Sequence, residues 1–277
     1  MAQRNIYDNP SFFSAYRGLK DGDTKQGTVG GGLTHDDLTR ILPPLKDTSI
    51  LDLGCGDGWF SYWAVTCGGA AKVKGLDSSI LQIRAAQSTA ARLGDDQANR
   101  LTYQIADLNT LTPVKNTYHI VFSSLTLHYL RDLKGLMESI FASLKPGGMF
   151  YFTVEHPIYT APTHREVCTH PATTKTAKDG EGRHDAETAA PAADAHWRLN
   201  GYWDQGPRTH YWLGHEVEKQ HWKMETYVNS LVGTGFELVY MHEWPRVDDG
   251  KHKAESWWLP TEVGPTYLML GARKRED

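Results

Sequence analysis

The chain has few cysteines and no long apolar run, and each absence excludes a class of protein. Its three cysteines, Cys55, Cys67 and Cys168, form no CxxC pair. This argues against a disulfide-stabilised secreted domain and is typical of a reduced cytoplasmic protein. No segment has the roughly 20 consecutive apolar residues of a membrane span, and residues 1–5 do not begin a signal peptide. We therefore expect a cytoplasmic protein without a membrane partner.

Positive charge is not in excess either. The chain contains 29 basic and 33 acidic residues, for a net charge of −4. Proteins that bind tRNA, rRNA or DNA need a basic surface that neutralises phosphates, so no nucleic acid partner is expected. The length of 277 residues suits one α/β domain with elaborations. Nothing in the sequence indicates an oligomeric state.

Residues 169–195 lack large apolar side chains. The segment contains no Val, Ile, Leu, Met, Phe, Trp or Tyr, so it cannot bury enough apolar surface to offset the entropy of ordering. We predict a mobile loop, and a lid that orders on substrate binding is the alternative. His164, Cys168, His170 and His184 lie in or beside it without the spacing of a metal site, so no metal is predicted.

Against these absences, residues 50–60 (ILDLGCGDGWF) form a clear motif. A short apolar strand leads into three glycines at alternate positions, and an amphipathic segment follows. Such a turn lets the backbone approach a nucleotide, and the helix N-terminus behind it offers free N–H groups. The dinucleotide fingerprint would need a glycine at Trp59, and Asp57 would repel a polyphosphate. The expected ligand is nucleoside-like and not phosphate-rich.

Strands and helices alternate along the chain from residue 49. Apolar runs predict strands at 49–53, 72–76, 101–106, 118–123 and 149–155. The helical period of the apolar residues predicts a helix at 132–144. This alternation implies an α/β fold, with a mostly parallel, doubly wound sheet covered on both faces. Two further apolar runs, at 236–244 and 266–272, would form a final antiparallel pair.

Four motifs in this order resemble those of the class I (Rossmann-like) S-adenosylmethionine-dependent methyltransferases. They are residues 51–58 (LDLGCGDG), 73–79 (VKGLDSS), 106–108 (ADL) and 144–148 (LKPGG). The resemblance covers residues 49–156. It implies a seven-stranded, mostly parallel sheet with an antiparallel final strand. It also implies S-adenosyl-L-methionine as the cofactor and a small molecule as the methyl acceptor.

The resemblance also divides the chain into three parts. Residues 1–45 would form an N-terminal helical cap. Residues 46–156 and 223–277 would form the Rossmann-like core that binds the cofactor. Residues 157–222 would be an insertion that covers the substrate and contains the mobile loop.

The cofactor residues follow from the same motifs. Asp77 ends the second strand, where a carboxylate accepts two hydrogen bonds from a ribose diol; capping the next helix is the alternative, although Ser78 or Ser79 suits a cap better. Asp107 would bind the adenine amino group, or be an ordinary turn residue. Asp52 would hold the methionine ammonium, or be a buried carboxylate satisfied by the loop. The predicted cofactor-binding set is Tyr16, Asp52, Gly54, Cys55, Gly56, Asp77, Ser78, Ala106, Asp107, Leu108, Ser123 and Ser124.

Two histidines are predicted on the rim where the acceptor would bind. His128 follows the fourth strand and His156 ends the fifth. A hydroxyl or ammonium acceptor needs a base, and histidine titrates in the useful range. The alternatives are structural: His128 bonded to backbone, and His156 anchoring the insertion.

An aromatic-rich stretch at 197–222 would form the acceptor pocket. Trp203, Tyr211, Trp212 and His221 are the predicted substrate-binding residues, since ring faces suit a flat or apolar acceptor and a sulfonium. Plain packing of an inserted subdomain is the alternative.

The sequence thus predicts methyl transfer to an oxygen, or a nitrogen, of a small, partly apolar metabolite, with secondary metabolism as the setting. Oxygen is preferred because the rim histidines suit a hydroxyl. One alternative is a cyclase or isomerase that uses the bound cofactor without methyl transfer. The others are a non-catalytic cofactor-binding protein and a methyltransferase of proteins or peptides.

Overall fold

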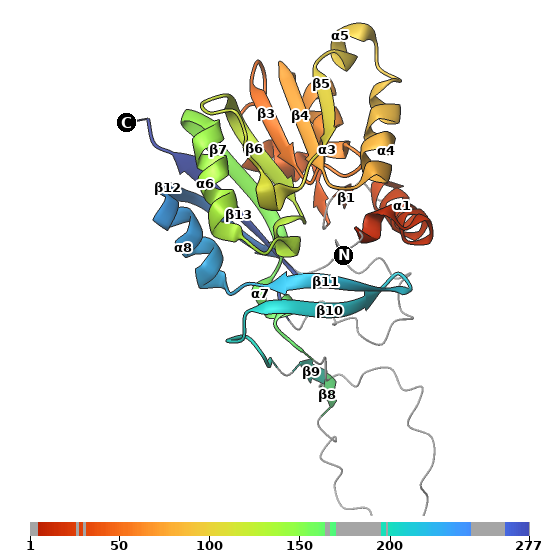
Figure 1. Ribbon diagram of the computed structural model, residues 1–277, viewed down its shortest axis with the longest axis vertical. Coiled ribbons are helices and arrows are strands. Elements are labelled where there is room, and N and C mark those ends of the chain that lie inside the picture. Colours follow the sequence, from red (N-terminus) through yellow and green to blue (C-terminus); the bar gives the residue numbers. More distant parts are fainter. Residues whose placement is uncertain are drawn as a thin grey trace, which may run out of the picture.

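The computed structural model describes residues 5–25, 28–29, 32–163, 167–169, 195–197, 199–244 and 264–276. Its centre is a seven-stranded sheet in the order β12-β13-β7-β6-β3-β4-β5, with helices on both faces (Figure 1). The strands are β3 (Ser49–Leu53), β4 (Lys72–Asp77), β5 (Leu101–Ile105), β6 (Tyr118–Ser124), β7 (Leu144–Glu155), β12 (Phe236–Trp244) and β13 (Tyr267–Lys274). The predicted strands are confirmed.

The sheet is parallel except at β13. This strand pairs antiparallel with both β7 and β12, whereas β3 pairs parallel with β4 and β6. The predicted antiparallel final strand is therefore confirmed. Because the parallel strands point the same way, their carboxyl ends meet at one edge of the sheet, where open α/β sheets bind ligands.

Alternate strand residues enter two separate cores. On one face, Ile50 and Phe122 pack with Phe60 and Trp63 of α3 (Trp59–Thr66). On the other face, the neighbouring residues of the strands pack against α6 (Leu133–Ser143) and α8 (Met224–Thr234). This period-two alternation explains the apolar strand sequences, because a sheet covered on both faces buries both sets of side chains.

The predicted helix at 132–144 is α6, and Asp132 caps it by accepting a hydrogen bond from the Gly135 N–H. The next strand begins earlier than the predicted residue 149. Leu144 already pairs with Tyr118, and the register shifts before Met149 pairs with Ile120. The turn residues 146–148 therefore form an irregularity inside β7 rather than a separate connection.

The remaining helices lie around the sheet and before it. They are η1 (Ile6–Asp8), α1 (Pro10–Lys25), α2 (His35–Ile41), α4 (Ile80–Ala90), α5 (Asp95–Ala98), η2 (Leu108–Thr110), η3 (Leu127–Tyr129) and α7 (Pro157–Thr160). The helix α2 begins after Thr34, which forms a capping box with Asp37. Among the helices in the described ranges, none is long and apolar enough to cross a membrane.

Three two-stranded sheets complete the structure. They are β1 (Thr28–Val29) with β2 (Leu33–Thr34), β8 (Val167–Thr169) with β9 (Ala195–Trp197), and β10 (Gly206–Trp212) with β11 (His215–His221). The hairpin β10–β11 lies across the end of the sheet near α7 (Figure 1). The predicted mobile loop 169–195 lies outside the described residues, apart from its two ends in β8 and β9.

Candidate functional site

The glycine motif forms a tight turn between β3 and α3 at the carboxyl edge of the sheet. Gly54 and Gly58 have φ of 66° and 80°, in the left-handed region. A Cβ at Gly54 would lie 2.0 Å from Thr126 Oγ1, and a Cβ at Gly58 would lie 2.5 Å from the Tyr103 hydroxyl oxygen. Both positions therefore require glycine for conformation and for space. The turn leaves a backbone cradle beside the tips of β3 and β4.

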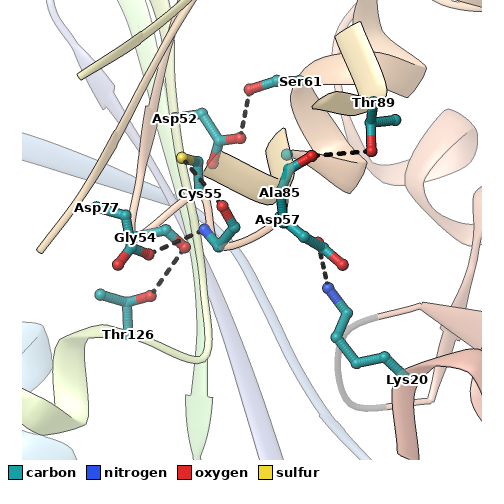
Figure 2. A network of polar contacts seen from close by, with 12 residues as sticks. Lys20, Asp52, Gly54, Cys55, Asp57, Ser61, Asp77, Ala85, Thr89 and Thr126 are labelled. Carbon is teal, nitrogen blue, oxygen red and sulfur yellow. Dashed lines mark hydrogen bonds and ion pairs between the residues drawn. The ribbon is translucent and has the colours of Figure 1, made fainter. Parts of the chain in front are cut away.

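Asp77 links the tip of β4 to this turn. Its Oδ2 accepts a hydrogen bond from the Gly56 N–H in the turn at 2.9 Å (Figure 2). Its Oδ1 accepts one from the Ser79 N–H at 2.8 Å. The cap of α4 is Ser79, whose Oγ accepts from the Gln82 N–H, as the sequence suggested. Burial raises the pKa of Asp77. Its carboxylate orients the turn and keeps further lone pairs for a ligand.

Asp52 is a second buried carboxylate, at the end of β3. It is 2% exposed, and its Oδ2 accepts a hydrogen bond from Ser61 Oγ at 2.7 Å (Figure 2). Burial, with a smaller contribution from the nearby Asp77 charge, raises the pKa of Asp52 to about 7. A cation in this site would favour its ionised form.

An ion pair that was not predicted covers the turn. Lys20 of α1 lies 2.5 Å from Asp57 Oδ1, with side chains 17% and 21% exposed, as Figure 2 shows. The Lys20 ammonium also lies 5.9 Å from the centre of the Tyr16 ring. The pair joins the N-terminal helix to the glycine turn. No sequence signal identifies such a pair, because its partners are 37 residues apart.

The N-terminal segment makes further contacts with the tips of the strands. Asn5 Nδ2 donates a hydrogen bond to Ser78 Oγ at 2.9 Å, and Ser79 Oγ donates one to Asp8 Oδ1 at 2.7 Å. The hydroxyls of Tyr7 and Tyr129 lie 3.1 Å apart. These contacts hold the N-terminal segment against the same edge as Asp77.

Tyr16 belongs to an aromatic group at this edge. Its ring centre lies 5.1 Å from that of Tyr7 and 5.9 Å from that of Trp212. Of the predicted acceptor walls, Trp212 thus faces the N-terminal segment, and the ring centre of Phe12 lies 5.6 Å from its own. Trp203 and Tyr211 lie elsewhere, 78% and 69% exposed.

The other predicted cofactor residues lie along the same strand ends. Asp107 caps η2, and its Oδ1 accepts hydrogen bonds from the backbone and side chain of Asn109. Ser123 Oγ donates to the Leu53 carbonyl at 2.8 Å, and the hydroxyls of Ser124 and Thr153 lie 3.1 Å apart. The remaining residues follow the same edges: Cys55 in the turn, 3% exposed, and Ala106 and Leu108 on either side of Asp107.

The chain leaves β6 through a strained residue. Leu125 has a φ of 50°, a region that non-glycine residues rarely adopt. Hydrogen bonds from its N–H to the backbone and side-chain oxygens of Thr153 hold it. This bend brings Thr126 against Gly54, where Thr126 Oγ1 donates to the Gly54 carbonyl at 3.4 Å. Strain of this kind clusters at functional sites.

The structure distinguishes the predicted histidines. His156 accepts a hydrogen bond from the Ile158 N–H at Nδ1, and its Nε2 lies 2.7 Å from Glu243 Oε1. His221, fully buried, bonds to Thr160 Oγ1 and to the Tyr202 carbonyl. In both rings, each nitrogen therefore has a hydrogen-bond partner. The two histidines anchor the region between β7 and β11.

His128 has a different environment. It is 1% exposed, and its Nδ1 accepts a long hydrogen bond of 3.5 Å from the Glu155 N–H. Burial, as the main cause, lowers the pKa of His128 to about 4. The ring is therefore neutral at physiological pH. With Nδ1 accepting, its proton is on Nε2.

A buried ion pair beside His128 was not predicted. Lys219 Nζ lies 2.5 Å from Glu155 Oε1, with side chains 8% and 15% exposed. The ammonium lies 5.2 Å from the Trp212 ring centre and 5.8 Å from that of Tyr129. Glu155 precedes His156 at the end of β7, and that position was the one available signal. Its partner on β11 is set by tertiary structure alone.

The site fits a cationic nucleoside. The turn offers a cradle that a Cβ at Gly54 or Gly58 would fill, and two buried carboxylates, Asp52 and Asp77, flank it. Asp57, the acidic residue in the turn, is paired with Lys20. Buried carboxylates favour positive ligand groups and disfavour phosphates.

Comparisons with known proteins agree. The methyltransferase domain family matches residues 50–148. A solved S-adenosylmethionine-dependent methyltransferase from Mesorhizobium loti is 32% identical, with a TM-score of 0.67, and the alignment covers 86% of this chain and 96% of that one. An uncharacterized Haemophilus influenzae protein is 25% identical over 98% of each chain.

A third relative matches a smaller part of the chain. It is the ubiquinone biosynthesis O-methyltransferase of Methylobacterium nodulans, 29% identical over 39% of this chain and 41% of its own length. The Mesorhizobium protein, by contrast, is similar over nearly its whole length. On this similarity and the seven-stranded fold, the chain belongs to the class I S-adenosylmethionine-dependent methyltransferases, with S-adenosylmethionine as the cofactor.

Proposed function

We propose that the protein transfers a methyl group to an oxygen, or a nitrogen, of a small, partly apolar metabolite. The observation that supports this most directly is the aromatic cover at the carboxyl edge of the sheet. Tyr7, Tyr16 and Trp212 come from the N-terminal segment and from the hairpin β10–β11, and they pack together there. A cover that closes over a site favours a small acceptor, whereas a macromolecule needs an open groove.

Bound S-adenosylmethionine supplies an electrophilic methyl group on a sulfonium. In this proposal, Asp77 and Ser78 hold the ribose, and Ala106, Asp107 and Leu108 hold the adenine. Asp52, Gly54, Cys55 and Gly56, with Ser123 and Ser124, hold the methionine part, and Tyr16 closes over it. The proposal is supported by the burial of Asp52 and Asp77, because their charge is stabilised when a cation binds beside them.

The predicted acid–base role of His128 stays a prediction, and its geometry favours donation. Because Nδ1 accepts from the Glu155 N–H, the neutral ring presents an Nε2–H donor that can orient the acceptor. Engagement of His156 and His221 at both nitrogens favours anchoring roles for them. Trp212 is retained as an acceptor wall, while the exposure of Trp203 and Tyr211 favours a place at the entrance.

One observation supports oxygen. The carboxylate of Glu155, which interacts with His128, can accept the proton that a hydroxyl acceptor loses. The net charge of −4 supports an acceptor other than a nucleic acid. The division into cap, core and cover, and a role in secondary metabolism, remain part of the proposal.

The first test is isothermal titration of the purified protein with S-adenosylmethionine and S-adenosylhomocysteine. Binding is expected for both. The second test incubates protein and S-adenosylmethionine with a metabolite extract and measures S-adenosylhomocysteine together with a product heavier by one methyl group. A cyclase or isomerase would convert its substrate without forming S-adenosylhomocysteine. Absence of heat with either compound would refute the proposal.

A further inference from the structure

The buried ion pair between Lys219 and Glu155 needs an explanation other than stability. Removing both charges from water costs several kcal/mol per ion, and a hydrophobic replacement is often as stable. The pair lies at the carboxyl end of β7, at the edge where open α/β sheets bind their ligands. Lys219 comes from β11 of the hairpin β10–β11. Buried charges at such an edge are typical of a functional site.

Glu155 has one carboxylate oxygen without a donor. Oε1 accepts a hydrogen bond from the Lys219 ammonium. Oε2 is buried and has no hydrogen-bond partner among the described residues. An unsatisfied buried carboxylate oxygen costs free energy until a donor reaches it. The whole side chain keeps 15% of its surface exposed although Oε2 itself is buried, so a donor reaches this oxygen once the carboxylate rotates toward the exposed side. The missing donor points to a ligand with a hydroxyl or N–H group.

The surroundings of Glu155 favour its ionised form. Burial alone would raise the pKa of Glu155, but the Lys219 ammonium, with a further contribution from His128, outweighs it and lowers the pKa to about 2. The titratable groups that face it are Lys219 on β11, His128 and Tyr129 at η3, His210 on β10 and Tyr227 on α8. The carboxylate is therefore an acceptor at any physiological pH.

A chain of contacts connects Glu155 to the cofactor turn. The Glu155 N–H donates to His128, which lies two residues after Thr126, and Thr126 Oγ1 bonds to the Gly54 carbonyl. The rings of Tyr129 and Trp212 flank the Lys219 ammonium. A flat ring with a polar edge directed at Glu155 would suit these neighbours.

We propose that Glu155, held by Lys219, accepts the hydrogen bond and then the proton of a phenolic hydroxyl that is the methyl acceptor. This inference rests on the proposed function and specifies its substrate class. An oxygen lone pair forms the new bond to the methyl carbon, and the sulfur–methyl bond breaks with its electron pair going to sulfur. The proton of the hydroxyl passes to Glu155. One positive charge and one negative charge disappear together, so atoms and charge balance.

A weakly basic carboxylate suffices for this proton. As the oxygen–carbon bond forms, the hydroxyl becomes oxonium-like and far more acidic than a carboxylic acid. Lys219 keeps Glu155 ionised beforehand, and His128 is a positioning residue through its bond to the Glu155 backbone.

The test uses 4-nitrophenol as the probe, with saturating S-adenosylhomocysteine, because its neutral and ionised forms absorb differently. In the wild type, the Glu155 carboxylate favours the protonated probe. In Glu155→Gln, the Lys219 charge is no longer compensated, so the apparent pKa of the bound probe should fall by about one to three units. Lys219→Met removes the cation and should raise the apparent pKa of the bound probe. Because this second variant shifts the pKa in the opposite direction, it tests the assignment if Glu155→Gln does not fold.

Glu218→Gln is the matched control. Glu218 lies beside Lys219 on β11, is 31% exposed, and pairs with Arg131 at the surface, so this variant should give the wild-type value. The assignment is overturned if the probe does not bind the wild type, if neither Glu155→Gln nor Lys219→Met shifts its pKa, or if Glu218→Gln shifts it equally. Titration with S-adenosylhomocysteine separates these outcomes from failure of the proposed function, which predicts binding in the wild type regardless of Glu155.

Discussion

Replacing Gly54 with alanine tests the geometry of the cofactor turn. Gly54 has a φ of 66°, where a Cβ costs about 1–2 kcal/mol. The new Cβ would also lie 2.0 Å, 2.4 Å and 2.6 Å from Thr126 Oγ1, Cγ2 and Cβ. Forcing these atoms apart adds about 1–3 kcal/mol. Together, Gly54→Ala should lower the free energy of unfolding by about 2–5 kcal/mol.

The steric part is separable from the conformational part. Thr126→Gly removes all three clashing atoms, so the double variant should recover about 1–3 kcal/mol relative to the sum of the single variants. The cost of the positive φ should remain. Urea denaturation of the two single variants and the double variant measures this coupling, and calorimetry with S-adenosylhomocysteine measures the accompanying loss of affinity.

Gly233→Ala is the control for this experiment. A Cβ at Gly233, inside α8, would have no atom within 4 Å apart from its chain neighbours and the nearby backbone of its own helix, so alanine should stabilise the protein by about 0.5–1 kcal/mol. If Gly54→Ala were as stable as the wild type and bound the cofactor equally, or if Thr126→Gly gave no coupling, the argument that the turn and Thr126 exclude a side chain would be wrong.

Three further predictions concern single side chains. Asp77→Ala should weaken S-adenosylhomocysteine binding by about 1.5–3 kcal/mol, measured by calorimetry, because a charged acceptor for the ribose is lost; equal affinity would remove Asp77 from the site. Burial raises the folded pKa of Asp52 to about 7 from 3.8. The stability that its proton contributes is therefore present below pH 3.8 and lost as the pH rises to about 7. As the pH rises between those values, the free energy of unfolding of the wild type should fall by up to roughly 4 kcal/mol relative to that of Asp52→Asn. If the free energies of unfolding of the two proteins changed in parallel with pH, this prediction would be wrong. His156→Ala should destabilise the fold by about 1–3 kcal/mol in denaturant titrations, because it leaves Glu243 and the Ile158 N–H without their partner; an unchanged midpoint would contradict its anchoring role.

Much of the fold could be predicted because its signals are local. The strands β3 and β6 are continuous apolar runs, and the repeat of Leu133, Leu136, Met137 and Ile140 identifies α6 without any knowledge of its neighbours. The boundaries of an element depend on tertiary contacts where two elements compete for the same residues. β7 begins at Leu144 because pairing with Tyr118 extends it through the turn residues 146–148, an effect that depends on a strand from elsewhere in the chain.

The candidate site divides in the same way. The glycine turn, Asp52 and Asp77 are identified by sequence because chemistry and spacing occur within one short motif. The partners Lys20 with Asp57, Tyr7 with Tyr129, and Lys219 with Glu155 are 37, 122 and 64 residues apart. No local pattern predicts these pairs.

The sequence by itself determined the glycine turn and the carboxylates beside it, since a strand, a turn that tolerates only glycine and an acidic strand end are adjacent or nearly so along the chain. Only the tertiary structure decided the surroundings of the histidines and of Glu155. It buried His128 and thereby kept it neutral, engaged both nitrogens of His156, and brought Lys219 from the hairpin to Glu155. The physical reason is that protonation states and ion pairs depend on burial and on distances across the fold, whereas backbone conformation in a turn depends on the residues within it.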